Sequence, residues 1–314
     1  MIPFPTHIDA SMRSSFAACP RKFFFQYLLR KVPVGTSIHL TFGGAMARGL
    51  EITRKAFYEG QMPLREAITE GSIALVKDWI ASETPFEIEG SPKSLATCTL
   101  ALEKYFEFFN PHDDYLSPMR YGDGRVAVEF TFAIPLDPRD GFPLHPITGL
   151  PILYTGRFDM LAQARTGALF IEDDKTTGQL GLNFTRSMKL RSQFTGYTWA
   201  CQQLGFPTAG VIVRATNPLR GDIKFAEIHE GRSPHVVTQW YRQLAADTRN
   251  MVAMWENYNN FGEKLGEFSA DLDDACGSYG GCPYLEACLS PDPQTVVENF
   301  FADNTWDPLV RDAA

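Results

Sequence analysis

Two aspartates and a lysine supply the clearest chemistry in the sequence. Asp159 ends the segment Gly-Arg-Phe-Asp, and Asp173 precedes Lys175 by two residues in the segment Glu-Asp-Asp-Lys. Side chains alternate between the two faces of a strand, so we expect Asp173 and Lys175 to project together and Glu172 and Asp174 to project to the opposite side. If the strands that carry Asp159 and Asp173 are neighbours, these two carboxylates can converge on one divalent cation.

A pair of carboxylates beside a lysine suits the hydrolysis of a phosphodiester. The reaction needs a hard cation that neutralises negative charge and lowers the pKa of its bound water. Mg²⁺ takes one or two carboxylates together with water and substrate phosphate, and a nearby lysine can orient the attacking water or stabilise the developing charge. An acid-x-Lys pattern alone is more often an ion pair at the end of a strand, so the surrounding motifs must decide.

A third motif follows on a predicted helix, in which Gln193 and Tyr197 are four residues apart and share a face. The order of a Gly-x-x-Asp strand, an Asp-x-Lys strand and a Gln-x-x-x-Tyr helix resembles the RecB-like branch of the PD-(D/E)XK nuclease superfamily. The resemblance implies a restriction-endonuclease-like fold in which Asp159 and Asp173 bind Mg²⁺ or Mn²⁺ and Lys175 is catalytic. It also implies that the Gln–Tyr pair supports the site or contacts DNA.

An early helix resembles the first motif of that family, which reads Phe-Gly-x-x-x-His-x-x-Leu-Glu. This chain has the same pattern from Phe42 to Glu51, with Ala47 at the position of the metal-binding histidine. Glu51, one turn further along the helix, and Glu129, on a predicted strand, are the candidates for the missing metal ligand. A surface salt bridge and a buried hydrogen bond are the alternative roles for both glutamates.

Four of the six cysteines form a second constellation. Cys276, Cys282 and Cys288 are separated by five residues each, whereas zinc ligands usually come in Cys-x(2–4)-Cys pairs. Iron–sulfur clusters take four thiolates and tolerate a distant ligand, for which Cys19 is the candidate. The segments Cys-Pro-Arg-Lys-Phe at Cys19 and Cys-Pro-x-x-x-x-Cys at Cys282 resemble iron–sulfur RecB-like nucleases, including AddB-type and CRISPR-adaptation exonucleases. The resemblance implies a [4Fe-4S] cluster that holds both chain ends together.

The periodicity of apolar residues indicates which elements position these motifs. A connection rich in Pro, Gly and Asp separates a helical first third from alternating strands, and two further helices follow. We expect a mixed sheet flanked by helices, in a single elaborated domain. Its parts are a mainly helical region at 1–124, a nuclease core at 125–230 and a helical, Cys-rich region at 231–314. The expected helices are 68–82, 94–109, 186–205 and 234–262, and the expected strands are 125–134, 152–162, 168–175, 209–215 and 224–230.

Composition narrows the classes of protein. The formal net charge of −8 argues against nucleic-acid binding through bulk electrostatics, although a local basic groove remains compatible with it. Apolar runs fall short of the ~18 residues that a membrane helix needs. Cysteines clustered in this way indicate metal binding more than disulfides. We therefore expect a soluble cytoplasmic protein; Cys98 and Cys201, which fall within helical patterns, are expected to be free core thiols.

Three functions are compatible with these motifs. The first is a Mg²⁺- or Mn²⁺-dependent DNA nuclease, in the family's manner an exonuclease acting on DNA ends or single strands in recombination, repair or phage DNA metabolism. The second is a catalytically weak or inactive iron–sulfur subunit that binds DNA within a recombination or CRISPR-adaptation complex, since Ala47 replaces the family histidine. The third is a zinc-stabilised interaction module whose acidic motifs are accidental.

Overall fold

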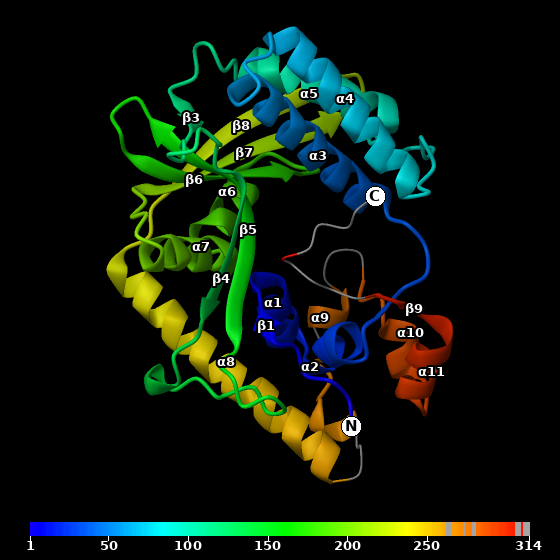
Figure 1. Cartoon of the computed structure of the whole chain (residues 1–314). Helices are drawn as coiled ribbons and strands as arrows, with labels where there is room; N and C mark the ends of the chain where they lie inside the picture. Colours follow the sequence, from blue (N-terminus) through cyan, green and yellow to red (C-terminus); the bar gives the residue numbers. More distant parts are fainter. Residues whose placement is uncertain (262–264, 273, 278–280, 305–308, 310–314) are drawn as a thin grey trace. The chain divides into compact units, whose positions relative to one another are not determined.

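The computed structural model describes residues 1–261, 265–272, 274–277, 281–304 and 309 (Figure 1). The chain divides into two compact units, each assembled from segments that are distant in the sequence. The first unit comprises Met1–Gly35, Phe132–Gly156 and the described residues from Pro234 onward. The second comprises Thr36–Thr131 and Arg157–Ser233. The end of the region expected at 231–314 lies outside the described residues, and the single-domain organisation stays a prediction.

Three helices of the second unit contribute most of an apolar cluster. They are α3 (Ile38–Tyr58), α4 (Leu64–Ala81) and α5 (Leu95–Phe108). The side chain of Ser94 accepts a hydrogen bond from the amide of Thr97 and so caps the start of α5. Helices α3 and α4 approach so closely that a Cβ at Gly71 would lie 2.6 Å from the carbonyl oxygen of Gly49. The buried core includes Phe42, Met46, Leu50, Leu75, Trp79, Leu102 and Tyr105.

The sheet of the second unit mixes parallel and antiparallel pairs, as the sequence predicts. Its strands run in the order β5-β6-β7-β8, and β3 and β4 also pair with β5. The β5–β6 and β7–β8 pairs are antiparallel, whereas β6 and β7 are parallel. Helices α3 to α5 lie on one side of these strands and α7 on the other (Figure 1). The strands are β3 (Leu116–Pro118), β4 (Val128–Pro135), β5 (Leu153–Ala164), β6 (Leu169–Thr176), β7 (Gly210–Leu219) and β8 (Asp222–Glu230).

The crossover between the parallel strands β6 and β7 contains two helices where the sequence predicts one. The expected helix 186–205 is replaced by α6 (Leu182–Lys189) and α7 (Ser192–Gln203). Arg191 between them has an extended ψ of 119°, which ends one helix and starts the next. Helix α6 buries only Met188, whereas α7 is buried along most of its length. The two segments therefore differ strongly in burial on either side of Arg191.

Aromatic side chains pack together in the core of the first unit. Phe24 lies 4.7 Å from Phe268 and 4.9 Å from Tyr258, measured between ring centroids. Arg13 of α1 forms a 2.7 Å ion pair with Asp247 of α8. The described part of the Cys-rich segment contains three short helices, α9, α10 and α11. The helices are α1 (Ala10–Ala18), α2 (Pro20–Phe23), η1 (Phe24–Leu28), η2 (Pro138–Asp140), α8 (Pro234–Asn260), η3 (Leu265–Glu267), α9 (Asp274–Gly277), α10 (Leu285–Leu289) and α11 (Pro293–Phe300).

Short strands complete the first unit. Strand β1 (His7–Ile8) pairs in parallel with the beginning of β5, where Ile8 lies opposite Tyr154. Strands β2 (Lys31–Val32) and β9 (Ala302–Asp303) form an antiparallel pair. Among the helices that the structure describes, none combines the length and the apolar character needed to cross a bilayer.

Candidate functional site

Strand β6 directs its charged residues to two different environments. Lys175 forms an ion pair with the buried carboxylate of Asp173. Glu172 and Asp174 instead both form ion pairs with Arg54 of α3, at 2.6 and 2.7 Å. The alternation predicted for this segment is therefore confirmed, and Asp173 and Lys175 form one charged pair at the end of the strand.

Asp159 lies beside this pair, as the sequence predicts. Met160 of β5 is opposite Glu172 of β6, so the same register brings Asp159 towards Asp173. The carboxylate of Asp159 accepts a 2.5 Å hydrogen bond from the backbone amide of Asp174. Burial raises the pKa of Asp159 well above its usual range, and the neighbouring carboxylates of Asp173, Asp174 and Glu129 raise it further. A cation at this position would relieve that repulsion.

Glu129 joins the carboxylates through an unusual backbone conformation. Its φ of 56° lies in the left-handed region, which is costly for a residue with a long side chain. The carboxylate pairs with Arg157 of β5 at 2.9 Å. Burial raises the pKa of Glu129, while Arg157 and Lys55 oppose the rise. Strain of this kind often accompanies a functional role, and here it holds a third carboxylate close to Asp159.

The second candidate glutamate, Glu51, is buried and held by cations of its own helix. Arg48 and Lys55 each contact its carboxylate at 2.7 Å. Glu51 therefore forms salt bridges, which were the sequence-based alternative to metal binding, but its carboxylate is buried and not at the surface.

Ala47, at the position of the family histidine, lines a cavity of about 210 Å³. The cavity lies between α3 and the ends of β6 and β7, and Lys175 contributes to its wall. Its lining is Gly43, Met46, Ala47, Leu50, Asp174, Lys175, Thr176 and Thr216. The methyl side chain at position 47 therefore borders open space next to the Asp–Lys pair.

Gln193 and Tyr197 contact each other on α7, as their spacing predicts. The side-chain amide of Gln193 donates to the hydroxyl of Tyr197 at 2.9 Å, and that hydroxyl donates to the carbonyl of Arg157 at 2.6 Å. The Tyr197 ring also packs 5.3 Å from Phe158. The pair thus fixes the backbone of β5 two residues before Asp159.

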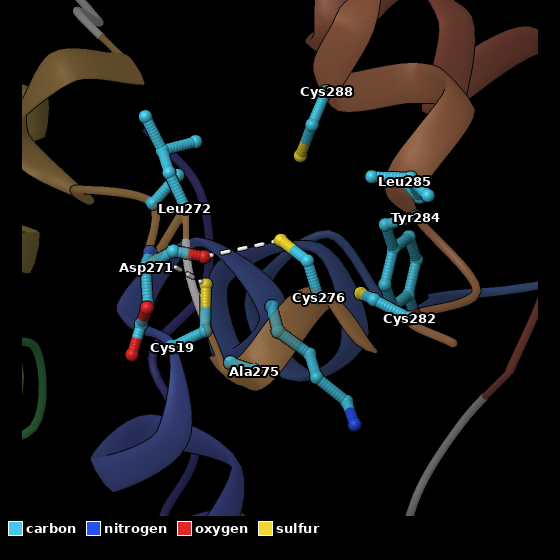
Figure 2. Close-up of a pocket in the computed structure, with 11 residues that line it drawn as sticks. Cys19, Asp271, Leu272, Ala275, Cys276, Cys282, Tyr284, Leu285 and Cys288 are labelled. Atoms are coloured by element: carbon cyan, nitrogen blue, oxygen red, sulfur yellow. Dashed lines mark hydrogen bonds between the residues drawn. The ribbon is translucent and has the colours of Figure 1, made fainter. Parts of the chain in front are cut away.

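The four cysteines singled out by the sequence line one cavity in the first unit. Cys19 precedes α2, Cys276 lies on α9, and Cys282 and Cys288 lie before and on α10. Their side chains face a common space (Figure 2). The backbone amide of Asp271 donates to the sulfur of Cys19 at 3.5 Å, a type of contact that stabilises thiolate ligands.

Neighbouring groups shift the pKa of one thiol in this cavity. Burial raises the pKa of Cys288, and the guanidinium of Arg21, which is hydrogen-bonded to it, opposes the rise. Cys98 and Cys201 are free and buried elsewhere, as predicted. Within the described ranges, no three Cys, His, Asp or Glu side chains are already arranged to hold a metal ion. The types of side chain nevertheless suit metal binding. The first unit offers the sulfurs of four cysteines, and the second offers the carboxylates of Asp159, Asp173 and Glu129.

Comparison with known proteins decides the family. The sequence signature of the PD-(D/E)XK nuclease superfamily matches residues 9–289. The chain belongs to this superfamily. Members of this superfamily are nucleases that use divalent metals such as Mg²⁺ or Mn²⁺.

Solved structures and curated proteins add little to this assignment. A protein from Eubacterium rectale, named as a candidate exonuclease, is 13% identical with a TM-score of 0.48, and the match covers 82% of each chain. The protein SSO0001 is 16% identical with a TM-score of 0.27, over 73% of this chain and 83% of the other. No curated protein matches the sequence.

A buried charge network supports strand β6 in this PD-(D/E)XK chain. Arg54 contacts Glu172, Asp174 and the hydroxyl of Tyr105, and that hydroxyl donates to Asp174 at 2.6 Å. Arg214 of β7 adds a 2.7 Å ion pair with Asp114. Burial raises the pKa of Glu172 to about 7 against the effect of these arginines. The network supports the face of β6 opposite Asp173, and no local motif marks Arg54 or Arg214 as partners of Glu172 because they come from distant segments.

We expect Arg54→Met to lower the free energy of unfolding by about 3–5 kcal/mol, because Asp174 then loses its cation and Glu172 keeps only Arg214, 3.6 Å away. Denaturation by urea measures this loss. Adding Glu172→Gln to the variant removes one of the orphaned charges and is expected to recover part of the stability. A loss below about 1 kcal/mol would show that water or a rearranged side chain replaces Arg54.

We expect Tyr197→Phe to reduce DNA cleavage by about 10-fold, because the backbone before Asp159 loses its anchor and a small displacement at a reacting centre is costly. The free energy of unfolding should fall by only about 1 kcal/mol. Steady-state cleavage and thermal melting measure the two effects. Tyr241→Phe, which removes a hydroxyl bonded to Asp140 in the other unit, is the matched control and should leave cleavage unchanged.

Proposed function

We propose that this PD-(D/E)XK chain is a metal-dependent DNA phosphodiesterase. Asp159 and Asp173 would hold Mg²⁺ or Mn²⁺, with Glu129 as the third carboxylate. The observation that carries the proposal is the burial of these acids close together, which raises the pKa of each of them. Carboxylates that repel one another in a nuclease fold are suited to a divalent cation.

The roles of the individual residues follow from their contacts. A bound cation would supply Lewis acidity and lower the pKa of a water molecule. Lys175, held by Asp173, is placed to orient the attacking water or to stabilise negative charge on the phosphate. Tyr197 and Gln193 position the strand that carries Asp159. Glu51 remains a candidate ligand, although Glu129 fits better because its charge acts directly on Asp159.

The substrate that fits the resemblance is DNA with a free or single-stranded end, cleaved as an exonuclease would in recombination, repair or phage DNA metabolism. The test uses single-stranded, duplex and circular DNA labelled at either end, with Mg²⁺, Mn²⁺ or EDTA. We expect Mg²⁺- or Mn²⁺-dependent release of short products from single-stranded ends and no cleavage in EDTA. Cleavage of circular DNA would instead indicate an endonuclease.

We further propose that Cys19, Cys276, Cys282 and Cys288 ligate a [4Fe-4S] cluster with a structural role. All four line one cavity, two of them come from segments more than 250 residues apart, and the hydrogen bond from Asp271 suits a sulfur that carries negative charge. Bound zinc is the alternative that four thiolates also allow.

One observation favours a second function. Ala47 leaves open space beside Lys175 where the family has a metal-binding histidine. A chain that lacks this ligand could retain DNA binding with weak or no hydrolysis, as a subunit of a recombination or CRISPR-adaptation complex. Binding of DNA ends without cleavage in any metal would support this alternative over the enzyme.

A further inference from the structure

Two basic side chains of α3 flank a buried glutamate next to the carboxylate site. Arg48 and Lys55 lie seven residues apart, so they are two helical turns apart on the same face. Both contact Glu51, at 2.7 Å each. The side chain of Glu51 is only 6% exposed, whereas those of Arg48 and Lys55 are 34% and 36% exposed. The glutamate thus holds two basic side chains, each of which is about one third exposed.

A third cation, Arg157, lies on β5 two residues before Asp159. It pairs with Glu129 at 2.9 Å, and its side chain is 36% exposed. The end of α3 is tied to the segment that leads into β4, because the carboxylate of Glu59 accepts a 2.7 Å hydrogen bond from the amide of Val126. The helix that carries Arg48 and Lys55 therefore ends against the strand that carries Glu129.

The environment of these cations differs from that of a purely structural arginine. Arg54, on the same helix, is 4% exposed, and its guanidinium forms hydrogen bonds with Glu172, Asp174 and Tyr105. Arg48 and Arg157 instead each pair with a glutamate, through Nη1 and Nε respectively, and about a third of each side chain is exposed. Cations already held in place lose little entropy when they bind an anion.

The overall charge favours such a local arrangement. A chain of net charge −8 cannot attract DNA through its bulk field, and the acidic site itself repels phosphate. Affinity for nucleic acid then depends on a few basic side chains near the carboxylates. We propose that Arg48, Lys55 and Arg157 bind consecutive phosphates of a single DNA strand and so guide it past Asp159. This inference rests on the proposed function and names the phosphate-binding part of the same site.

The salt dependence of DNA binding tests the inference. We would measure the Kd of a fluorescent single-stranded oligonucleotide at several NaCl concentrations, with Ca²⁺ in place of Mg²⁺ to prevent hydrolysis. Each phosphate contact contributes about 0.7 to the slope of log Kd against log salt for single strands. We expect Arg48→Gln, Lys55→Gln and Arg157→Gln each to reduce the slope by about that amount and to weaken binding several-fold.

The controls separate binding from folding and from catalysis. Arg65→Gln makes the same charge change at an exposed site on α4 and should leave the slope unchanged. Arg157→Lys keeps the charge and should retain most of the slope, which a misfolded variant would not do. Unchanged slopes in all three glutamine variants, from a wild-type protein that cleaves DNA, would overturn this inference alone. Reduced slopes in a protein that cleaves nothing would support the phosphate site and overturn the hydrolytic function.

Discussion

Asp159→Asn is expected to reduce metal-dependent DNA cleavage by about 1000-fold, equivalent to about 4 kcal/mol in the activation free energy. The amide keeps the shape of the carboxylate and its hydrogen bond from the amide of Asp174, but it has no charge for a divalent cation. Asp173→Asn should have a similar effect on cleavage. Single-turnover cleavage of a labelled single strand measures the loss for both variants.

The same substitution is expected to stabilise the metal-free protein. The pKa of Asp159 is raised in the folded state, so its ionised form at neutral pH opposes folding, and this cost grows as the pH rises from the pKa of the unfolded chain to that of the folded protein. Asparagine carries no charge and removes that cost. Denaturation in EDTA should therefore show a higher free energy of unfolding for Asp159→Asn at neutral pH.

Matched variants determine whether the loss of cleavage is specific. Glu70→Gln changes an exposed acid on α4 and should leave both cleavage and stability near those of the wild type. Lys175→Ala should also lose cleavage, because Lys175 is the cation paired with Asp173. Activity close to that of the wild type in both Asp173→Asn and Lys175→Ala would contradict the assignment of the site.

Cys288→Ala and Cys19→Ala are each expected to eliminate most of the bound iron and the broad absorbance at about 400 nm. Each variant removes one of the four thiols around the cavity in the first unit. A cluster that joins α2 to α10 contributes to folding, so its loss should lower the Tm by about 10 °C. Iron and sulfide analysis of anaerobically purified protein and thermal melting measure these changes.

Cys201→Ala is the control for the cysteine variants. Cys201 is a free thiol in the core of α7, and burial raises its pKa to about 12. Its substitution should cost about 1 kcal/mol of stability and leave the iron content unchanged. A colourless wild-type protein that binds one Zn²⁺ at the four cysteines would replace the cluster by a structural zinc site.

Local periodicity in the sequence was enough to predict much of the second unit. The alternation in β6 placed Asp173 with Lys175 and separated both from Glu172 and Asp174, and the ion pairs confirm this separation. The i, i+4 spacing of Gln193 and Tyr197 likewise predicted their contact. These predictions succeed because the geometry of a strand or a helix alone determines which neighbouring side chains meet.

The cysteine motifs also predicted a grouping of residues from distant segments. The sequence and its family resemblance grouped Cys19 with Cys276, Cys282 and Cys288, and the structure lines one cavity with all four. Whether that cavity holds a cluster stays a prediction. Residues 19 and 288 are far apart in the sequence. They were grouped because both are cysteines within motifs that resemble those of the same family.

Only the tertiary structure decided the contacts between distant segments. Arg54 gives no local sign that it neutralises Glu172 and Asp174, which lie more than a hundred residues away. The alternation of apolar residues gives no sign of the left-handed backbone at Glu129, and the break at Arg191 divides a helix that periodicity predicts as continuous. In each case the packing of neighbouring elements outweighs the local preference of the chain, and a sequence pattern reports only that local preference.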